Sequence, residues 1–168
     1  PLIIAHRGFS DEAPENSMAA FHRAIEARCD MIELDVRLSA DNVPIVFHDR
    51  RLQRTSNGSG LISEKHSRQL TTIDNGSWFS PKFSKERIPE LKDIFPLLKK
   101  NIRLNIEIKP DIVSTNDISA VELVVAEAEK AKVLSKVMFT SFNHQMIKEI
   151  NDIDESIITG VIYNPITH

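Results

Sequence analysis

The segment Ile32-Glu33-Leu34-Asp35-Val36 alternates aliphatic and acidic side chains. A β-strand directs successive side chains to opposite faces, so Glu33 and Asp35 share one face and the aliphatic residues share the other. The segment Asn105-Ile106-Glu107-Ile108-Lys109 repeats this pattern, with its isoleucines on one face. A carboxylate on an inward face is costly to desolvate unless something pairs with it. The two segments therefore predict neighbouring strands that hold a cation between them.

Short β-rich runs alternate with longer helical patterns along the rest of the chain, which is typical of an α/β fold. Six runs are candidate strands: residues 2–5, 31–36, 44–47, 104–108, 137–140 and 157–162. Apolar residues recur at helical spacing in residues 18–25, 91–98, 121–128 and 146–150. The candidate helix caps are Asn16 or Ser17, Asn116 or Asp117, and Asn143.

Residues 49–87 break this alternation, because they are rich in Ser, Asn and Gly and have only brief apolar content. We interpret them as an excursion inserted after the third strand, with a short helix near residues 63–70. Long excursions of this kind often form lids. No repeat or linker divides the 168 residues, so we expect one domain, residues 1–168, that contains this insertion.

Composition excludes several classes of function. The chain is 41% hydrophobic and 27% charged, as in globular proteins, and its net charge of −3 gives no strong attraction to nucleic acid or anionic membranes. No apolar run approaches the roughly 18 residues of a membrane span, and no leader opens the chain. We expect a soluble, cytoplasmic protein, with a secreted or periplasmic location as the alternative. The single cysteine, Cys29, permits no internal disulfide and no cysteine-based zinc site.

Further polar groups follow the first and third candidate strands, as His6-Arg7-Gly8 and His48-Asp49. In a parallel α/β barrel the carboxyl ends of the strands carry the active-site groups. We therefore expect these residues to join the acidic face of the other two strands in one site.

The chemistry of this site follows from its residue types. Glu33, Asp35 and Glu107 offer only oxygen ligands, which favour Mg²⁺ or Ca²⁺. With a divalent ion, these carboxylates keep a charge of about −1, and two basic residues bring the site to about +1, which suits a phosphodiester monoanion. The basic residues are Arg7 and Lys109, the expected phosphate contacts.

Two histidines complete the predicted site. His6 and His48 are the candidate proton donor and acceptor, because imidazole titrates near neutral pH. Two simpler interpretations remain open. Lys109 can serve only as an ion-pair partner for Glu107, and the acidic pair of the 31–36 strand can be exposed on a half-solvated antiparallel strand. The second fails to explain why the pattern recurs around Glu107.

Taken together, these segments resemble the glycerophosphodiester phosphodiesterase family, from Ile3 to about Asn143. The resemblance rests on separate motifs in a fixed order: His6-Arg7-Gly8, Pro14-Glu15-Asn16-Ser17, Glu33-Leu34-Asp35-Val36, His48-Asp49, Ile88-Pro89-Glu90-Leu91, Asn105-Ile106-Glu107-Ile108-Lys109 and Ser141-Phe142. The chain departs mildly from the family pattern at Ser17, where threonine is usual, and at Asn42, where glycine is common.

The resemblance implies a TIM-type barrel with a subdomain inserted after its third strand. It implies metal-dependent hydrolysis of glycerophosphodiesters to glycerol 3-phosphate and an alcohol, a reaction of lipid and glycerol metabolism that uses Ca²⁺ or Mg²⁺. By position, His6 and His48 resemble the acid/base pair. The residues that resemble the metal ligands are Glu33, Asp35 and Glu107, and those that resemble the phosphate contacts are Arg7 and Lys109. In the implied mechanism, the glycerol 2-hydroxyl attacks phosphorus and water then opens the cyclic phosphate.

The length of the chain sets an expectation of its own. A closed eight-stranded barrel usually needs about 250 residues, so we expect an incomplete barrel of about six βα units with unpaired edges on the first and last strands. A fragment, a shortened product and completion by another copy through these edges are all open. Two alternatives to a glycerophosphodiester phosphodiesterase remain: a non-catalytic module that binds metal, phosphate or a partner, and an enzyme of the same reaction class, a phosphodiesterase acting on lysophospholipids.

Overall fold

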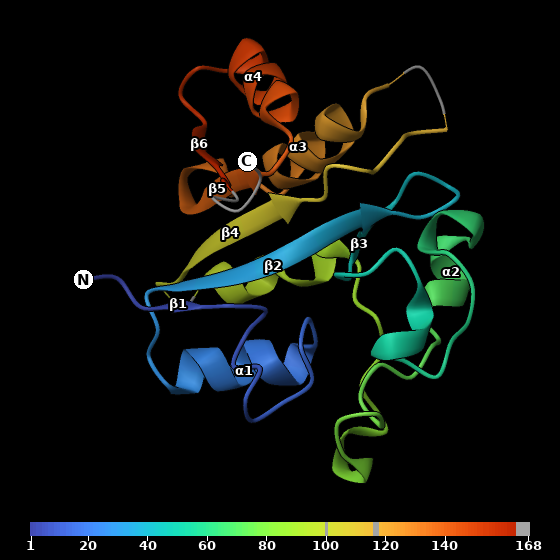
Figure 1. The fold of residues 1–168 in the computed structure, drawn as a ribbon. Helices are drawn as coiled ribbons and strands as arrows, with labels where there is room; N and C mark the ends of the chain where they lie inside the picture. Colours follow the sequence, from blue (N-terminus) through green and yellow to red (C-terminus); the bar gives the residue numbers. More distant parts are fainter. Residues whose placement is uncertain (100, 116–117, 164–168) are drawn as a thin grey trace.

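The computed structural model describes residues 1–99, 101–115 and 118–163, and it confirms the α/β class (Figure 1). Five strands form a parallel sheet in the order β1-β2-β4-β5-β6. In this TIM-type sheet β1 and β6 lie at the two ends and do not pair with each other within the described residues. The strands are β1 (Ile4–Ala5), β2 (Met31–Leu38), β3 (Pro44–Val46), β4 (Arg103–Ile108), β5 (Val137–Ser141) and β6 (Ile158–Val161).

The third strand corrects the predicted count of βα units. β3 runs antiparallel to β2, with Val36 opposite Val46 and Leu38 opposite Pro44. Residues 39–43 connect the two strands, and a parallel return needs a connection of roughly a dozen residues or more. β1 pairs with β2 only at Met31 and Ile32, and β3 pairs with the same edge of β2 further along, at Val36 to Leu38. Within the part of the chain that the structure describes, the sheet therefore has five parallel strands and one hairpin strand.

The longer helices match the predicted patterns, and Figure 1 shows α1 on one side of β2 and α3 and α4 on the other. The α-helices are α1 (Met18–Glu26), α2 (Ser67–Leu70), α3 (Ala120–Lys130) and α4 (His144–Ile153). Ser17 and Asn143 cap α1 and α4, as predicted, by accepting hydrogen bonds from backbone amides. Of the described helices, none has the length and apolar character that crossing a membrane requires.

Two details of the helices differ from the prediction. The N-cap of α3 is Ser119, which accepts a hydrogen bond from the Glu122 amide, whereas the candidates Asn116 and Asp117 lie outside the described residues. The pattern at residues 91–98 forms two short 3₁₀ segments, Leu91–Asp93 and Phe95–Lys99, rather than an α-helix. Pro96 within this stretch lacks an amide donor and disfavours a continuous α-helix.

Two hydrophobic cores support the molecule. The main core includes the apolar face of β2 and β4, such as Ile32, Leu34 and Ile106, which is buried against the helices. The second, smaller core lies under residues 49–87 and contains Ile45, Phe47, Leu52, Ile62, Leu70 and Ile88. Because β3 contributes to this second core, the excursion is anchored at the carboxyl end of β2, next to the polar face of the sheet.

Candidate active site

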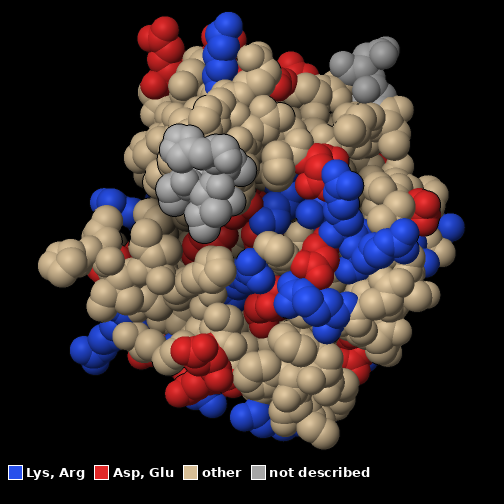
Figure 2. All heavy atoms as spheres, in the orientation of Figure 1, with Lys and Arg blue, Asp and Glu red and all other residues tan. Residues whose placement is uncertain are grey.

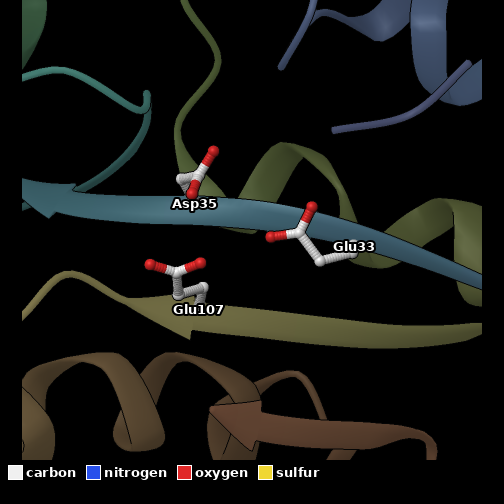
Figure 3. Close-up of side chains that lie close together, drawn as sticks. All are labelled: Glu33, Asp35 and Glu107. Atoms are coloured by element: carbon white, nitrogen blue, oxygen red, sulfur yellow. The ribbon is translucent and has the colours of Figure 1, made fainter. Parts of the chain in front are cut away.

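Strand pairing brings three carboxylates together on the polar face of the sheet. Asp35 on β2 lies directly opposite Glu107 on β4, and Glu33 precedes Asp35 on the same face. Oxygen atoms of the three carboxylates lie within 4.8 Å of one another (Figure 3). All three side chains are buried, with Asp35 fully shielded from solvent. The predicted acidic cluster therefore forms, and it forms between neighbouring strands.

The cluster fits a hard cation. Glu33 Oε2 accepts a hydrogen bond of 2.8 Å from the Arg7 amide, but Glu33 Oε1 is buried without a hydrogen-bond partner among the described residues. Burial, and then the charge of Asp35, raise the pKa of Glu33 to about 8. An unpaired oxygen in a buried carboxylate is the type of ligand that Mg²⁺ or Ca²⁺ binds.

Lys109 and Asn16 contact the carboxylates of the cluster directly. Lys109 Nζ donates to Glu107 Oε1 at 2.6 Å and forms an ion pair with Asp35 Oδ1 at 2.8 Å. Asn16 Nδ2 donates to Asp35 Oδ2 at 2.7 Å. Burial opposes ionisation of Asp35, but Lys109 and Asn16 outweigh it and keep the pKa of Asp35 below its usual value. Lys109 is thus the ion-pair partner of both Glu107 and Asp35, and its predicted role as a phosphate contact stays a prediction.

The loop after β1 brings Arg7 to the same cluster. Arg7 and Gly8 both have left-handed backbones, with φ of 57° and 80°. A Cβ atom on Gly8 would lie 2.7 Å from Ala20 Cβ on α1, so the close packing of this turn requires glycine. Arg7 Nε lies 3.3 Å from Asp35 Oδ2, and Arg7 Nη1 donates to Glu15 Oε1 at 2.9 Å.

The two histidines lie at the ends of different strands. The His6 side chain is 68% exposed, and its Nε2 lies 3.9 Å from Glu33 Oε2. Desolvation and the neighbouring Arg7 lower the pKa of His6. His48 Nδ1 lies 2.5 Å from Asp49 Oδ1. Because an ionised carboxylate only accepts, this contact places the His48 proton on Nδ1 and leaves Nε2 free to accept another.

Two arginines near His48 were not predicted from the sequence. Arg37 is buried, and its Nε donates to the His48 carbonyl at 2.7 Å. It shares the strand face of Glu33 and Asp35, but the predicted strand stopped at residue 36, one position too early. No motif or spacing in the sequence pointed to Arg54, because it lies in the excursion and only the tertiary fold brings it to the site. Figure 2 shows basic and acidic side chains interleaved over this end of the sheet.

A sequence model of the Glycerophosphoryl diester phosphodiesterase family matches residues 6–164. The chain belongs to this family. It is 37% identical over 163 residues to a glycerophosphodiester phosphodiesterase of Caldanaerobacter subterraneus subsp. tengcongensis. That match covers 96% of this chain and 66% of the relative, so the chain spans a little less than two thirds of the relative's length.

Solved structures of the same family share the fold. A glycerophosphodiester phosphodiesterase of Agrobacterium tumefaciens is 32% identical, with a TM-score of 0.84 over 94% of this chain and 65% of that protein. An Oleispira antarctica phosphodiesterase, in complex with the product sn-glycerol-3-phosphate, is also 32% identical, with a TM-score of 0.81 over 96% of this chain and 65% of that protein. These similarities confirm the family resemblance and the TIM-type fold class.

Proposed function

We propose that this chain hydrolyses glycerophosphodiesters to glycerol 3-phosphate and an alcohol, with a divalent cation held by Glu33, Asp35 and Glu107. The observation that carries the proposal is the buried acidic cluster with an unpaired Glu33 oxygen, which lies beside the cationic groups of Arg7 and Lys109. The glycerol 3-phosphate bound by the Oleispira relative supports this class of product.

Charge balance supports a phosphodiester as the substrate. Lys109 and Arg7 offset two of the three carboxylate charges, so a divalent cation would leave the site with a charge of about +1. A phosphodiester carries one negative charge and two non-bridging oxygens. The guanidinium of Arg7 can donate to one or both oxygens, and the Lys109 ammonium can act as a point charge.

The chemistry divides between the cation and the protein. A bound Mg²⁺ or Ca²⁺ would polarise the phosphoryl group and lower the pKa of the attacking hydroxyl. In the proposed first step, the glycerol 2-hydroxyl oxygen bonds to phosphorus, and the bond to the alcohol oxygen breaks. One imidazole of the His6 and His48 pair accepts the hydroxyl proton, and the other donates a proton to the departing oxygen. In the second step, a water oxygen bonds to phosphorus and the bond to the glycerol 2-oxygen breaks, which gives glycerol 3-phosphate. The imidazole that donated in the first step accepts the water proton, and the other returns its proton to the 2-oxygen.

The proposal is tested by incubating the purified chain with glycerophosphocholine or lysophosphatidylcholine, with Mg²⁺, Ca²⁺ or a chelator. We expect glycerol 3-phosphate from glycerophosphocholine in the presence of a divalent ion and none with the chelator. Cleavage of lysophosphatidylcholine alone would overturn the substrate assignment and keep the reaction class. No cleavage of either by folded protein would contradict the proposal and favour a non-catalytic binding module.

A further inference from the structure

Arg54 joins two sides of the candidate active site through paired hydrogen bonds. It lies at the end of the 3₁₀ segment Leu52–Arg54, within the excursion. Its Nε and Nη2 donate to the two oxygens of Asp49, at 2.7 and 2.9 Å. Its Nη1 and Nη2 donate to the two oxygens of Glu15, at 2.9 and 2.7 Å. One guanidinium therefore holds two carboxylates from different loops in fixed positions.

Each of these carboxylates touches a residue of the proposed chemistry. Asp49 Oδ1 lies 2.5 Å from His48 Nδ1, and Glu15 Oε1 accepts from Arg7 Nη1 at 2.9 Å. Burial opposes ionisation of Glu15, but Arg54 and Arg7 outweigh it and lower the pKa of Glu15. The hydrogen bonds from Arg54, and then His48, lower the pKa of Asp49. Both carboxylates thus stay ionised as acceptors.

We propose that Arg54 is a positioning residue that sets the orientation of His48 through Asp49 and that of Arg7 through Glu15. This inference rests on the proposed phosphodiesterase function. It also gives the excursion a role, because the residue that aligns the site belongs to the insertion and not to the strands. A planar guanidinium can donate in parallel to two carboxylates, which a lysine ammonium cannot do with the same geometry.

Kinetics of Arg54 variants test the proposal. We expect R54A to lower kcat by roughly 10- to 100-fold, by analogy with the loss of groups that orient metal ligands, and to raise KM. D49N should reproduce the fall in kcat, and E15Q should reproduce the rise in KM. R54K should stay close to R54A, because it restores charge without the planar pair of hydrogen bonds. Millimolar guanidinium should partly restore R54A, since the Arg54 side chain is 46% exposed.

A matched control is R51A in the same segment. Arg51 is exposed and makes no ion pair or side-chain hydrogen bond within the described residues, so its loss should leave kcat and KM unchanged. Wild-type kinetics of R54A, or full activity of R54K, would overturn the positioning role. A lowered melting temperature of R54A with unchanged kcat and KM would show a structural role only and would equally overturn it.

A second readout does not depend on turnover. Nitrogen NMR of the imidazole should show the His48 proton on Nδ1 in the wild type and in R51A. In R54A we expect a mixture of the two tautomers, because Asp49 loses its fixed position. If the wild type does not hydrolyse the substrates but R54A still changes the His48 signals, the proposed function fails while the positioning role stands. Unchanged His48 signals in R54A contradict the positioning role whatever the activity.

Discussion

The paired strands β2 and β4 and the excursion of residues 49–87 hold their polar groups by different means. In the strands, six consecutive backbone pairs, from Met31 opposite Arg103 to Val36 opposite Ile108, fix which side chains meet. In the excursion, scattered backbone hydrogen bonds are joined by side-chain ones that hold the backbone, as where Asp74 accepts hydrogen bonds from Gly76 and Ser77. A ladder of backbone hydrogen bonds makes geometry predictable from residue spacing, whereas side-chain networks depend on the finished fold.

The largest expected effect concerns the two histidines, of which His48 directly precedes the excursion. H48A and H6A should each lower kcat by about 10²- to 10⁴-fold, the usual contribution of general acid–base catalysis. Both side chains are partly exposed, so melting temperatures should stay close to that of the wild type. Steady-state kinetics and thermal unfolding measure the two effects. H22A, an exposed position on α1, is the control. Near-full turnover by H6A or H48A would refute the acid/base assignment for that residue.

The next largest effect is on metal binding by the acidic cluster of β2 and β4. E107Q removes one charge from the acidic cluster, and E33Q removes the carboxylate with the unpaired oxygen. Each should weaken binding of Mg²⁺ or Ca²⁺ by more than about 100-fold, beyond the usual cost of losing an outer-shell partner. Titration calorimetry measures the affinity, with E129Q on the exposed face of α3 as the control. Unchanged affinity in both variants would exclude this cluster as the metal site.

Core substitutions compare the two regions directly. I106A in the main core and I62A under the excursion each remove a fully buried side chain, at a cost of about 2–5 kcal/mol in unfolding free energy. The region that loses protection from hydrogen exchange should differ between the two variants. Hydrogen exchange should rise only in residues 49–87 for I62A and throughout the sheet for I106A, because local unfolding follows cooperative units. Equal loss of protection in β2 and β4 for I62A would show that the excursion does not unfold separately.

The smallest expected effect is on stability, and it concerns the hydrogen bonds between the β2–β3 hairpin and the excursion. Asp41 accepts hydrogen bonds from Ser39 and from the amide and hydroxyl of Ser67. Although desolvation opposes ionisation, these bonds lower the pKa of Asp41 from 3.8 to about 2. The stabilisation is therefore present above about pH 4 and is lost as the pH falls toward 2.

Urea unfolding at pH 5 and pH 3 measures this effect. The stability difference between wild type and D41N should shrink at the lower pH, and exposed D11N should show no such change. A difference that stays constant between the two pH values would mean that the Asp41 carboxylate contributes nothing through its charge.

The site residues on the strands were predictable because side-chain parity needs only a correct strand. Glu33, Asp35, Glu107 and Lys109 meet as their alternation predicts. Arg37 was missed because β2 continues to Leu38, past the predicted end. The predicted count of about six βα units included β3, which instead runs antiparallel to β2 after the short connection of residues 39–43.

The contacts of the excursion were not predictable in the same way. Arg54 is 39 residues from Glu15 in sequence, and no periodicity relates the two positions. Their contact depends on how the excursion packs on Ile45 and Phe47 through its own small core. Asp49 was part of a recognised motif, but its role as the link between His48 and Arg54 became visible only in the structure. Side-chain networks of this kind need the tertiary fold.

The central claim is that Glu33, Asp35 and Glu107 together hold one divalent cation. Anomalous diffraction from crystals soaked in Mn²⁺, a hard cation that accepts the same oxygen ligands, tests this claim most directly. We expect one strong peak among the three carboxylates in the wild type and none in E107Q. A saturating soak that gives no peak there, or a peak bound only by other residues, would contradict it.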